Sequence, residues 1–227
     1  MKLETLYRWK DDSPRDCAFQ MALDEALFHV TREHALPVIR YYTWDAPALS
    51  FGYSELFPSE ETADAVRRYT GGGRVEHGND LTFLLTLPAD SSVARVNASE
   101  RYRWIHEALK AALGQVDVRL FLEGNSGATS PGPCFQTPVP ADLMSLQTGK
   151  KIGGGAQRRS RGSVIHQGSI RLSHDLRTKH EVWTDFFEKE LSKRVESFPE
   201  VRRQKVIDEA ERLAVTRYRC ADWNHRR

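Results

Sequence analysis

Two glycine triplets stand beside basic residues, and each could hold a ligand against the backbone. In the first, Arg67 and Arg68 precede Gly71–Gly73, and His77 follows. Three successive glycines carry an entropic cost that an ordinary turn does not require, and they let backbone N–H groups face an anion or a carbonyl. The spacing fits neither a phosphate-binding P-loop nor a dinucleotide-binding fingerprint. A plain glycine loop between a helix and a strand is the alternative interpretation.

The second triplet begins with a lysine. Lys151 is followed by Ile152, Gly153–Gly155 and Ala156. A lysine at the start of a strand can direct its ammonium at a ligand carbonyl held on glycine backbone, and it then stabilises developing negative charge as an oxyanion hole does. For an isolated basic pair a solvated turn is the simpler interpretation, but two such triplets in one chain favour a shared ligand.

Three cysteines, Cys17, Cys134 and Cys220, lie far apart in the sequence. Their odd number and scattered positions fit reduced thiols better than a disulfide framework. A lone cysteine is usually a small buried side chain, and this interpretation fits Cys17 and Cys220. Cys134 lies in a Pro-Gly-Pro-Cys-Phe segment, where a loop would enter a strand. No histidine and cysteine share the spacing of a zinc site, so we expect no metal.

Alternating helix and strand signals provide the elements that must position these groups. Apolar residues at helical spacing, and β-branched or aromatic runs between turn residues, define the two kinds of element. We predict helices over 15–33, 59–68, 99–113, 179–194 and 199–214. We predict strands over 3–9, 38–44, 48–53, 80–87, 143–147, 151–152 and 163–172, with 38–44 and 48–53 paired as a hairpin. The interleaved pattern indicates an α+β fold with a mixed sheet and helices packed on it.

The composition is that of a folded protein with a large core. The 227 residues include 33 Lys and Arg against 31 Asp and Glu, and 40% are hydrophobic, which excludes long-range disorder and a collagen-like chain. No apolar run is long enough to span a membrane, and the first residues lack the apolar core of a signal peptide. We therefore expect a cytoplasmic protein and one large domain over 1–227.

The net charge of +2 conceals a basic segment. Residues 143–174 contain six Lys and Arg and no acidic residue, and they include the whole second glycine triplet. Such a segment in a balanced chain suggests an anionic ligand or partner nearby, although local fluctuation explains the charge equally well.

Further motifs extend these two segments into a family resemblance. Residues 21–25 (Met-Ala-Leu-Asp-Glu), 42–44 (Tyr-Thr-Trp) with Pro47, and 50–53 (Ser-Phe-Gly-Tyr) occur in order with the two triplets. Together they resemble the lipoate–protein ligase and octanoyltransferase family, which is related to biotin protein ligase, over about residues 20–172. The resemblance implies a mixed, largely antiparallel sheet flanked by helices, and a tunnel for a medium-chain acyl or lipoyl group.

The resemblance also implies the residues of the site. Lys151 matches the family lysine that contacts the carbonyl or carboxyl of the acyl group. Residues expected to line the substrate-binding site are Arg68, Gly71, Gly72, Gly73, His77, Gly153, Gly154, Gly155 and Ala156. Two departures affect substrate detail: His77 is not followed directly by an acidic residue, and the second triplet lacks the serine that often interrupts it. The role of His166, in a His-Gln-Gly-Ser segment, is unassigned.

Cys134 decides the predicted mechanism. The cysteine-dependent octanoyltransferases, one branch of the family, carry a nucleophilic Cys-Phe at about this place. This similarity implies that Cys134 attacks an octanoyl thioester on an acyl carrier protein, with Lys151 as the neighbouring cation. A lysine of a lipoyl domain of a 2-oxoacid dehydrogenase, or of a glycine-cleavage H protein, then accepts the octanoyl or lipoyl group. This chemistry requires no cofactor, and we expect neither nucleic acid nor a membrane as a partner.

Three other functions stay open. An ATP-dependent lipoate–protein ligase would form a lipoyl-adenylate with ATP and Mg²⁺, and Lys151 would contact the carboxylate and α-phosphate. Ligases of this family usually need an accessory domain, whereas only 55 residues follow Leu172 and we expect no separate C-terminal domain. A non-catalytic module that captures an acyl group or carrier protein, and a biotin transferase, are the weaker alternatives.

Overall fold

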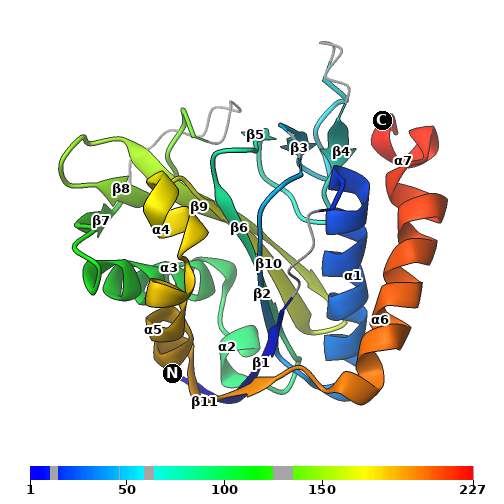
Figure 1. Cartoon of the computed structure of the whole chain (residues 1–227), viewed down its shortest axis with the longest axis horizontal. Coiled ribbons are helices and arrows are strands. Elements are labelled where there is room, and N and C mark those ends of the chain that lie inside the picture. Colours follow the sequence, from blue (N-terminus) through cyan, green and yellow to red (C-terminus); the bar gives the residue numbers. More distant parts are fainter. Residues whose placement is uncertain (11–14, 46, 59–63, 125–134, 227) are drawn as a thin grey trace.

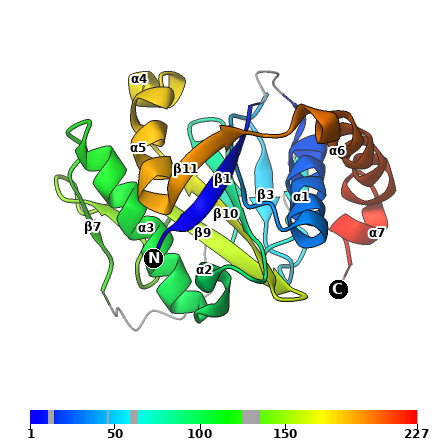
Figure 2. The same ribbon diagram turned by 90° about the horizontal axis from the view of Figure 1, so that it is seen from below.

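The fold is a curved sheet with helices on both faces (Figures 1 and 2). The computed structural model describes residues 1–10, 15–45, 47–58, 64–124 and 135–226. Within these residues, eight strands form the main sheet and three short strands form a second, smaller sheet at one end of it. The prediction of an α+β fold with a mixed, largely antiparallel sheet is confirmed.

The main sheet has the strand order β11-β1-β2-β6-β10-β9-β8-β7. β1 pairs in parallel with β11 and β2, and the remaining neighbours pair antiparallel. Its strands are β1 (Leu3–Trp9), β2 (Val38–Tyr42), β6 (Leu81–Leu87), β7 (Leu120–Leu122), β8 (Leu143–Ser145), β9 (Lys151–Ser160), β10 (Ser163–Ile170) and β11 (Ser192–Ser197). The small sheet has the order β4-β3-β5, from β3 (Leu49–Phe51), β4 (Ala65–Arg67) and β5 (Val75–Glu76).

Two helix layers cover the main sheet. On one face lie α1 (Cys17–His34) and α6 (Glu200–Leu213), and on the other lie α3 (Ala98–Gly114) and α5 (Glu181–Leu191), as Figures 1 and 2 show. Shorter helical segments are α2 (Ser92–Arg95), α4 (His174–Thr178), a π-helix over Ala214–Tyr218, and α7 (Ala221–Asn224). None of the helices in the described residues is long and apolar enough to cross a membrane.

β6 shows why the chain needs both helix layers. All seven residues of this central strand are buried, because helices cover both of its faces. Phe83 and Leu85 join the apolar cluster that includes side chains from α3 and α5. Leu84, which points to the opposite face, joins the cluster that includes side chains from α1 and α6. Only the face of Leu81, Phe83, Leu85 and Leu87 is wholly apolar, because Thr82 and Thr86 lie beside Leu84 on the other face.

A two-residue turn fixes how β9 and β10 pair. Arg161 and Gly162 both have positive φ, 49° and 84°, as a hairpin turn of the type favoured by strand twist requires. The resulting register places Gly155 opposite Gly168 and Ala156 opposite Gln167. The second glycine segment is thereby brought against the residues that follow His166.

Several sequence predictions about elements are wrong. The runs 38–44 and 48–53 form strands, but β2 and β3 belong to different sheets and do not form a hairpin. The predicted helix over 59–68 is contradicted where it is described, because Ala65–Arg67 is strand β4, paired in parallel with β3. Tertiary pairing overrides local helical signals in such short segments.

The predicted boundaries also change. The glycines after Lys151 do not end a strand, because β9 continues through them to Ser160. The predicted helices over 179–194 and 199–214 are α5 and α6, separated by the unpredicted strand β11. Asp16 caps α1 by accepting a hydrogen bond from the backbone N–H of Phe19 at 2.7 Å.

Candidate active site

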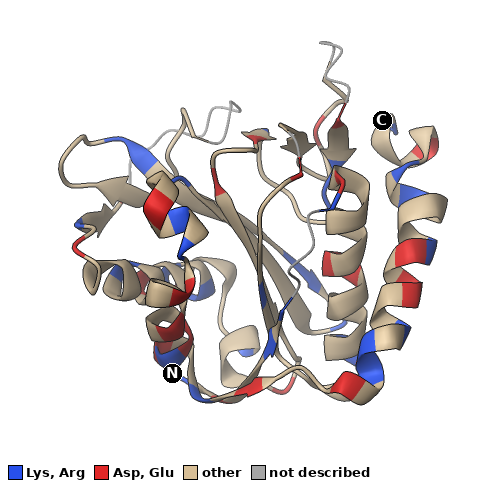
Figure 3. Ribbon diagram, in the orientation of Figure 1, with Lys and Arg blue, Asp and Glu red and all other residues tan. Residues whose placement is uncertain are grey.

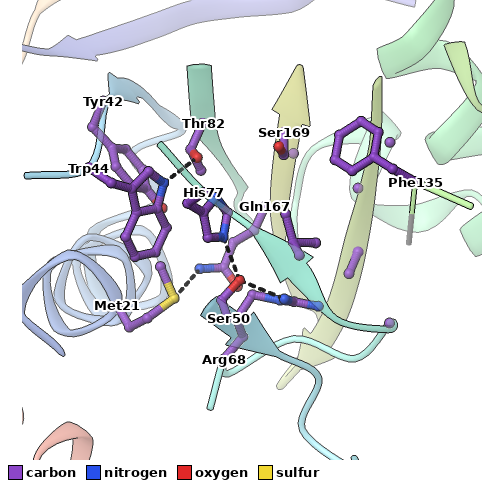
Figure 4. A pocket seen from close by; sticks show the side chains of 16 residues that line it. Met21, Tyr42, Trp44, Ser50, Arg68, His77, Thr82, Phe135, Gln167 and Ser169 are labelled. Carbon is purple, nitrogen blue, oxygen red and sulfur yellow. Dashed lines mark hydrogen bonds between the residues drawn. The ribbon is translucent and has the colours of Figure 1, made fainter. Parts of the chain in front are cut away.

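A narrow cavity opens where the small sheet meets β6, β10 and β9 (Figure 4). Its lining residues are Met21, Tyr42, Trp44, Ser50, Arg68, Gly72, Val75, His77, Thr82, Phe135, Gly154, Gly155, Ala156, Gln167, Gly168 and Ser169. The free space is about 30 Å³, room for a few water molecules at most.

The two arginines before the first triplet have different roles. Arg68 enters the cavity, and its guanidinium donates to Ser50 Oγ at 2.7 Å and to the carbonyl oxygens of Gly71 and Gly73. Arg67 points away and donates to the carbonyl oxygens of Trp223 and Asn224, among others, which ties β4 to α7. Neighbouring residues on a strand face opposite sides, so only Arg68 is placed to meet a ligand.

A positive φ and a tight contact with a side chain explain Gly72 but not Gly71. Gly72 has a φ of +84°, and a Cβ there would lie 3.2 Å from Ala156 Cβ. A Cβ on Gly52 would lie only 1.8 Å from the Gly72 carbonyl oxygen. Gly71 has nothing within 4 Å of such a Cβ, and neither Gly71 nor Gly73 is among the residues that line the cavity. Of the first triplet, only Gly72 forms part of the wall.

His77 lies at the centre of a hydrogen-bonded chain. Its Nδ1 is 2.8 Å from Asp80 Oδ2, and its Nε2 is 2.6 Å from Ser50 Oγ. Trp44 stacks on the imidazole with ring centroids 3.9 Å apart. The acidic partner that the family pattern places directly after the histidine is therefore supplied three residues later, by Asp80.

Burial and hydrogen bonding set the charges along this chain. Burial lowers the pKa of His77 below its usual value, although Asp80 opposes the shift. Burial alone would raise the pKa of the Asp80 carboxyl, but hydrogen bonds from His77, Ser169 and Thr82 bring it below its usual value. At neutral pH the histidine is thus a neutral base beside a carboxylate.

A second polar network explains the motif at residues 21–25. Asp24 Oδ2 accepts from Tyr42 Oη at 2.8 Å and from Gln167 Nε2 at 2.7 Å, and its Oδ1 accepts from Arg40 at 2.7 Å. Gln167 Oε1 in turn accepts from Thr70 Oγ1 at 2.7 Å. This buried network joins α1, β2 and β10 to the segment just before the first triplet, and it holds those elements around the cavity.

Lys151 lies behind the cavity wall and is paired with a buried carboxylate. Its Nζ is 2.7 Å from Asp142 Oδ2, and the two side chains are 2% and 0% exposed. Tyr102 Oη donates to Asp142 Oδ1 at 2.6 Å and accepts from the Gly155 N–H at 2.8 Å. The sequence did not predict that Asp142 and Tyr102 belong to the site, because nothing in their spacing relates them to Lys151.

The second triplet is glycine because side chains occupy the space of each missing Cβ. At Gly154 a Cβ would lie 2.7 Å from Lys151 Cε and 2.9 Å from Asp142 Oδ1. At Gly155 it would lie 2.6 Å from His166 Nε2. Gly154, Gly155 and Ala156 line the cavity, whereas Lys151 and Gly153 do not. Lys151 thus reaches the cavity only past Gly154.

Cys134, the predicted nucleophile, lies outside the described residues. The residue that follows it, Phe135, lines the cavity, and its ring faces Arg171 at 3.9 Å and Lys151 Nζ at 5.8 Å. Burial raises the pKa of Cys17 to about 11, which leaves its thiol protonated at neutral pH. In the part of the chain that the structure describes, no group of three or more His, Cys, Asp or Glu could hold a metal ion.

His166 does not line the cavity but lies behind Gly155. It is fully buried with His106, Tyr102 and Phe83 around it, and its ring nitrogens have no hydrogen-bond partner among the described residues. His106 Nδ1 donates to the Ala141 carbonyl oxygen at 2.6 Å. Burial lowers the pKa of His166 well below its usual value and that of His106 to about 4.

The buried histidines predict a loss of stability in acid. Because the unfolded chain binds a proton at His106 below about pH 6.5 and the folded chain only below about pH 4, the free energy of unfolding falls between these values. We expect proton uptake at His106 in the unfolded chain to lower the free energy of unfolding by about 2 kcal/mol between pH 7 and pH 5. Urea denaturation at both values should show a smaller loss for His106→Asn, whose amide can still donate to the Ala141 carbonyl. The exposed control His174→Asn should leave the loss unchanged, and an unchanged loss in His106→Asn would contradict the assignment.

The basic segment 143–174 does not form one patch. Its Lys and Arg positions lie at both ends of β9 (Figure 3). Arg158 packs between Tyr53 and Tyr69, at 4.2 and 4.0 Å from their ring centroids, and Arg159 donates to carbonyl oxygens around the end of α2. Several of these cations therefore have local structural roles.

The sequence matches a known family. Residues 16–215 match the lipoyl protein ligase A/B catalytic domain, and the chain belongs to this family. Octanoyltransferase LipM of Oceanobacillus iheyensis is 32% identical over 177 residues, 73% of this chain and 64% of that protein. LipM of Bacillus subtilis is 30% identical over 192 residues, 77% of this chain and 68% of that protein. The match thus covers a little under two thirds of the length of the O. iheyensis relative.

Solved structures agree with this assignment. Lipoate–protein ligase A with bound ATP superposes with a TM-score of 0.72 at 20% identity, over 99% of each chain. A structure of the Thermoplasma acidophilum lipoylation system, with a bipartite lipoate protein ligase, superposes with a TM-score of 0.69 at 18% identity, over 99% of this chain and 96% of that one. At these identities the likeness establishes the fold. The predicted family and fold are confirmed.

Proposed function

We propose that this chain is an acyltransferase that moves an octanoyl or lipoyl group from a carrier-protein thioester to a protein lysine. The observation that carries the proposal is the meeting of the two glycine segments at one cavity. Arg68 enters this cavity, and the buried Lys151 ammonium lies directly behind Gly154. The relatives at 30–32% identity are named octanoyltransferases, which supports transfer rather than another reaction of the family.

The proposed reaction has two steps through Cys134. In the first, the Cys134 sulfur attacks the thioester carbonyl, a new thioester forms, and the carrier thiol leaves with a proton. In the second, the amine of an acceptor lysine attacks, an amide forms, and the Cys134 thiol is restored. Lys151 would stabilise the oxyanion in both steps, with the Asp142 carboxylate holding its ammonium in place. The position of Phe135 at the cavity supports a role for its neighbour Cys134 there.

The proposal extends to partners and organisation. The donor is an acyl carrier protein, and the acceptor is a lipoyl domain of a 2-oxoacid dehydrogenase or a glycine-cleavage H protein. The reaction needs no cofactor, takes place in the cytoplasm, and is carried by one catalytic domain over 1–227. The substrate-binding residues are those that the family motifs give, with Arg68, Gly72, His77, Gly154, Gly155 and Ala156 at the cavity wall.

An ATP-dependent lipoate–protein ligase is the second candidate. It is favoured by the superposition on ligase A with bound ATP over nearly the whole chain. In that reaction Lys151 would contact the carboxylate and α-phosphate, ATP and Mg²⁺ would be required, and Cys134 would have no role. The T. acidophilum ligase is described as bipartite, so a ligase based on this chain would use a separately encoded accessory protein.

Replacing Cys134 by alanine is expected to abolish the covalent intermediate. Intact-mass analysis after mixing the chain with octanoyl-loaded carrier protein should show one added octanoyl group, released by neutral hydroxylamine as a thioester is. The adduct should be absent in Cys134→Ala and present in the matched control Cys220→Ala. An adduct that persists in Cys134→Ala would exclude this nucleophile, and lipoate- and ATP-dependent release of pyrophosphate that survives the substitution would favour the ligase.

A further inference from the structure

Ser50, His77 and Asp80 are arranged as a serine, a base and an orienting acid. Ser50 Oγ is 2.6 Å from His77 Nε2, and His77 Nδ1 is 2.8 Å from Asp80 Oδ2. Both distances are within the hydrogen-bond reach that a nucleophile–base–acid triad requires, and such triads are recognised by geometry rather than by order in the sequence. His77 and Asp80 are three residues apart between β5 and β6, and the pairing of β3 with β5 brings Ser50 to them.

The protons of this chain can be placed from its partners. The Asp80 carboxylate can only accept, so His77 Nδ1 carries the proton and Nε2 is the acceptor. Arg68 Nη1 donates to Ser50 Oγ at 2.7 Å, which leaves the serine hydroxyl to donate to Nε2. This is the tautomer in which histidine can take the proton of the serine.

The acid and the base are both held firmly. Asp80 Oδ2 also accepts from Ser169 Oγ at 2.6 Å and from Thr82 Oγ1 at 3.1 Å, and Trp44 stacks on the imidazole. The His77 side chain is 3% exposed, and burial keeps it neutral at neutral pH. A fixed, neutral imidazole beside a buried carboxylate is what a general base in such a site requires.

Ser50 is also placed to meet a ligand. It is buried from solvent, yet it lines the cavity beside Arg68 (Figure 4), and Gly72 and Ala156 belong to the same lining. The Arg68 guanidinium beside Oγ supplies positive charge where a serine alkoxide and a tetrahedral oxyanion would form. A device that served only to orient Arg68 would not require a histidine and a carboxylate behind the serine.

We propose that Ser50 is a second nucleophile of this chain, which takes an acyl group from an activated ester or thioester and passes it to water. In the first step the Ser50 oxygen attacks the acyl carbon, its proton moves to His77 Nε2, and the alcohol or thiol leaves with that proton. In the second step His77 takes a proton from water and the water oxygen attacks the serine ester. The bond to the Ser50 oxygen then breaks, the proton passes from His77 to that oxygen, and the free acid leaves. The inference rests on the proposed function only in that the cavity admits an acyl group, and it does not involve Cys134.

Covalent labelling of the Cys134→Ala protein tests this directly. The full chain is treated with short- and long-chain alkyl fluorophosphonates, which react with activated serines, and the modified peptide is mapped by mass spectrometry. The expected result is one phosphonyl group on Ser50 and its loss in His77→Gln. The inference is overturned if neither probe labels Ser50 in the folded Cys134→Ala protein, or if the label lies on another serine. This test needs no substitution of Ser50.

Turnover provides the second readout. Cys134→Ala is expected to hydrolyse an aryl octanoate ester, with a rate that rises with pH and levels off once His77 is neutral. Ser50→Ala and Asp80→Asn should each lower this rate by about a hundredfold or more. The exposed control Ser197→Ala on β11 should not change it. A rate that Ser50→Ala leaves unchanged in a folded protein contradicts the inference.

The two proposals can fail separately. An octanoyl adduct on Cys134 together with no label on Ser50 removes the second nucleophile and leaves the transferase intact. A label on Ser50 together with no Cys134 adduct removes the proposed transfer mechanism and leaves the serine site intact.

Discussion

Replacing Lys151 by glutamine is expected to lower the rate of acyl transfer by about 10²- to 10³-fold. An amide cannot supply the charge that the ammonium brings to the oxyanion. The same substitution also has a structural cost, because the Asp142 carboxylate loses its cation while fully buried. Breaking a buried ion pair from one side costs about 3–5 kcal/mol, so the single variant alone would not separate chemistry from folding.

A double variant separates the two effects. In Lys151→Gln/Asp142→Asn both partners are neutral, and Tyr102 can still hydrogen-bond to the Oδ1 position of residue 142. Urea denaturation should show that most of the lost free energy of unfolding returns, whereas the transfer rate should stay at the level of the single variant. A double variant that is both stable and active would remove Lys151 from the reaction. If the double variant recovers neither stability nor activity, Asp142 must have a role besides its ion pair with Lys151.

Replacing Gly154 by alanine is expected to lower transfer by about a hundredfold while the chain still folds. The added Cβ would lie 2.7 Å from Lys151 Cε and 2.9 Å from both Lys151 Nζ and Asp142 Oδ1, so the pair must move. The atoms in conflict are the ends of side chains rather than backbone, so the strand itself can persist. Displacement of a positioned catalytic group by about 1 Å is enough for a loss of this size.

Gly114→Ala is the matched control for Gly154→Ala. A Cβ at Gly114 has nothing within 4 Å, and the residue ends α3 away from the cavity. Transfer rates and thermal unfolding should be measured on both variants. Full activity in Gly154→Ala would show that the Lys151–Asp142 pair need not hold its observed position. If Gly154→Ala unfolds while Gly114→Ala does not, β9 and the side chains around Gly154 cannot move enough to accept the added Cβ.

The sequence predicted the elements whose signals are local. Helices α1, α3 and α6 follow from the periodicity of their apolar residues, and β6 follows from a short segment rich in leucine, phenylalanine and threonine. β11 could not be predicted in this way, because Ser192–Ser197 is a polar edge strand that pairs with β1 alone. Its strand conformation comes from that parallel pairing with a segment far away in the chain, and β4 is explained likewise by its pairing with β3.

In the candidate site, too, the residues that belong to local motifs were predicted and their partners were not. Arg68, His77 and Lys151 were found because they belong to ordered motifs, and the structure places each at or directly behind the cavity wall. Their partners Asp80 and Asp142 were missed as partners, because a hydrogen bond between side chains leaves no mark on spacing. His166, although part of a motif, is buried behind Gly155, since His166 and the cavity-lining Gln167 are successive residues of β10 and face opposite sides of the sheet.

The most direct test of the proposed function is the mass of an isolated lipoyl domain after incubation with the chain and an octanoyl-loaded carrier protein, without ATP or Mg²⁺. We expect the domain to gain one octanoyl group on a lysine and to gain none when Cys134→Ala replaces the wild-type chain. A domain that stays unmodified with the thioester donor, but is modified when free lipoate or octanoate is supplied with ATP and Mg²⁺, would contradict the transferase and identify a ligase.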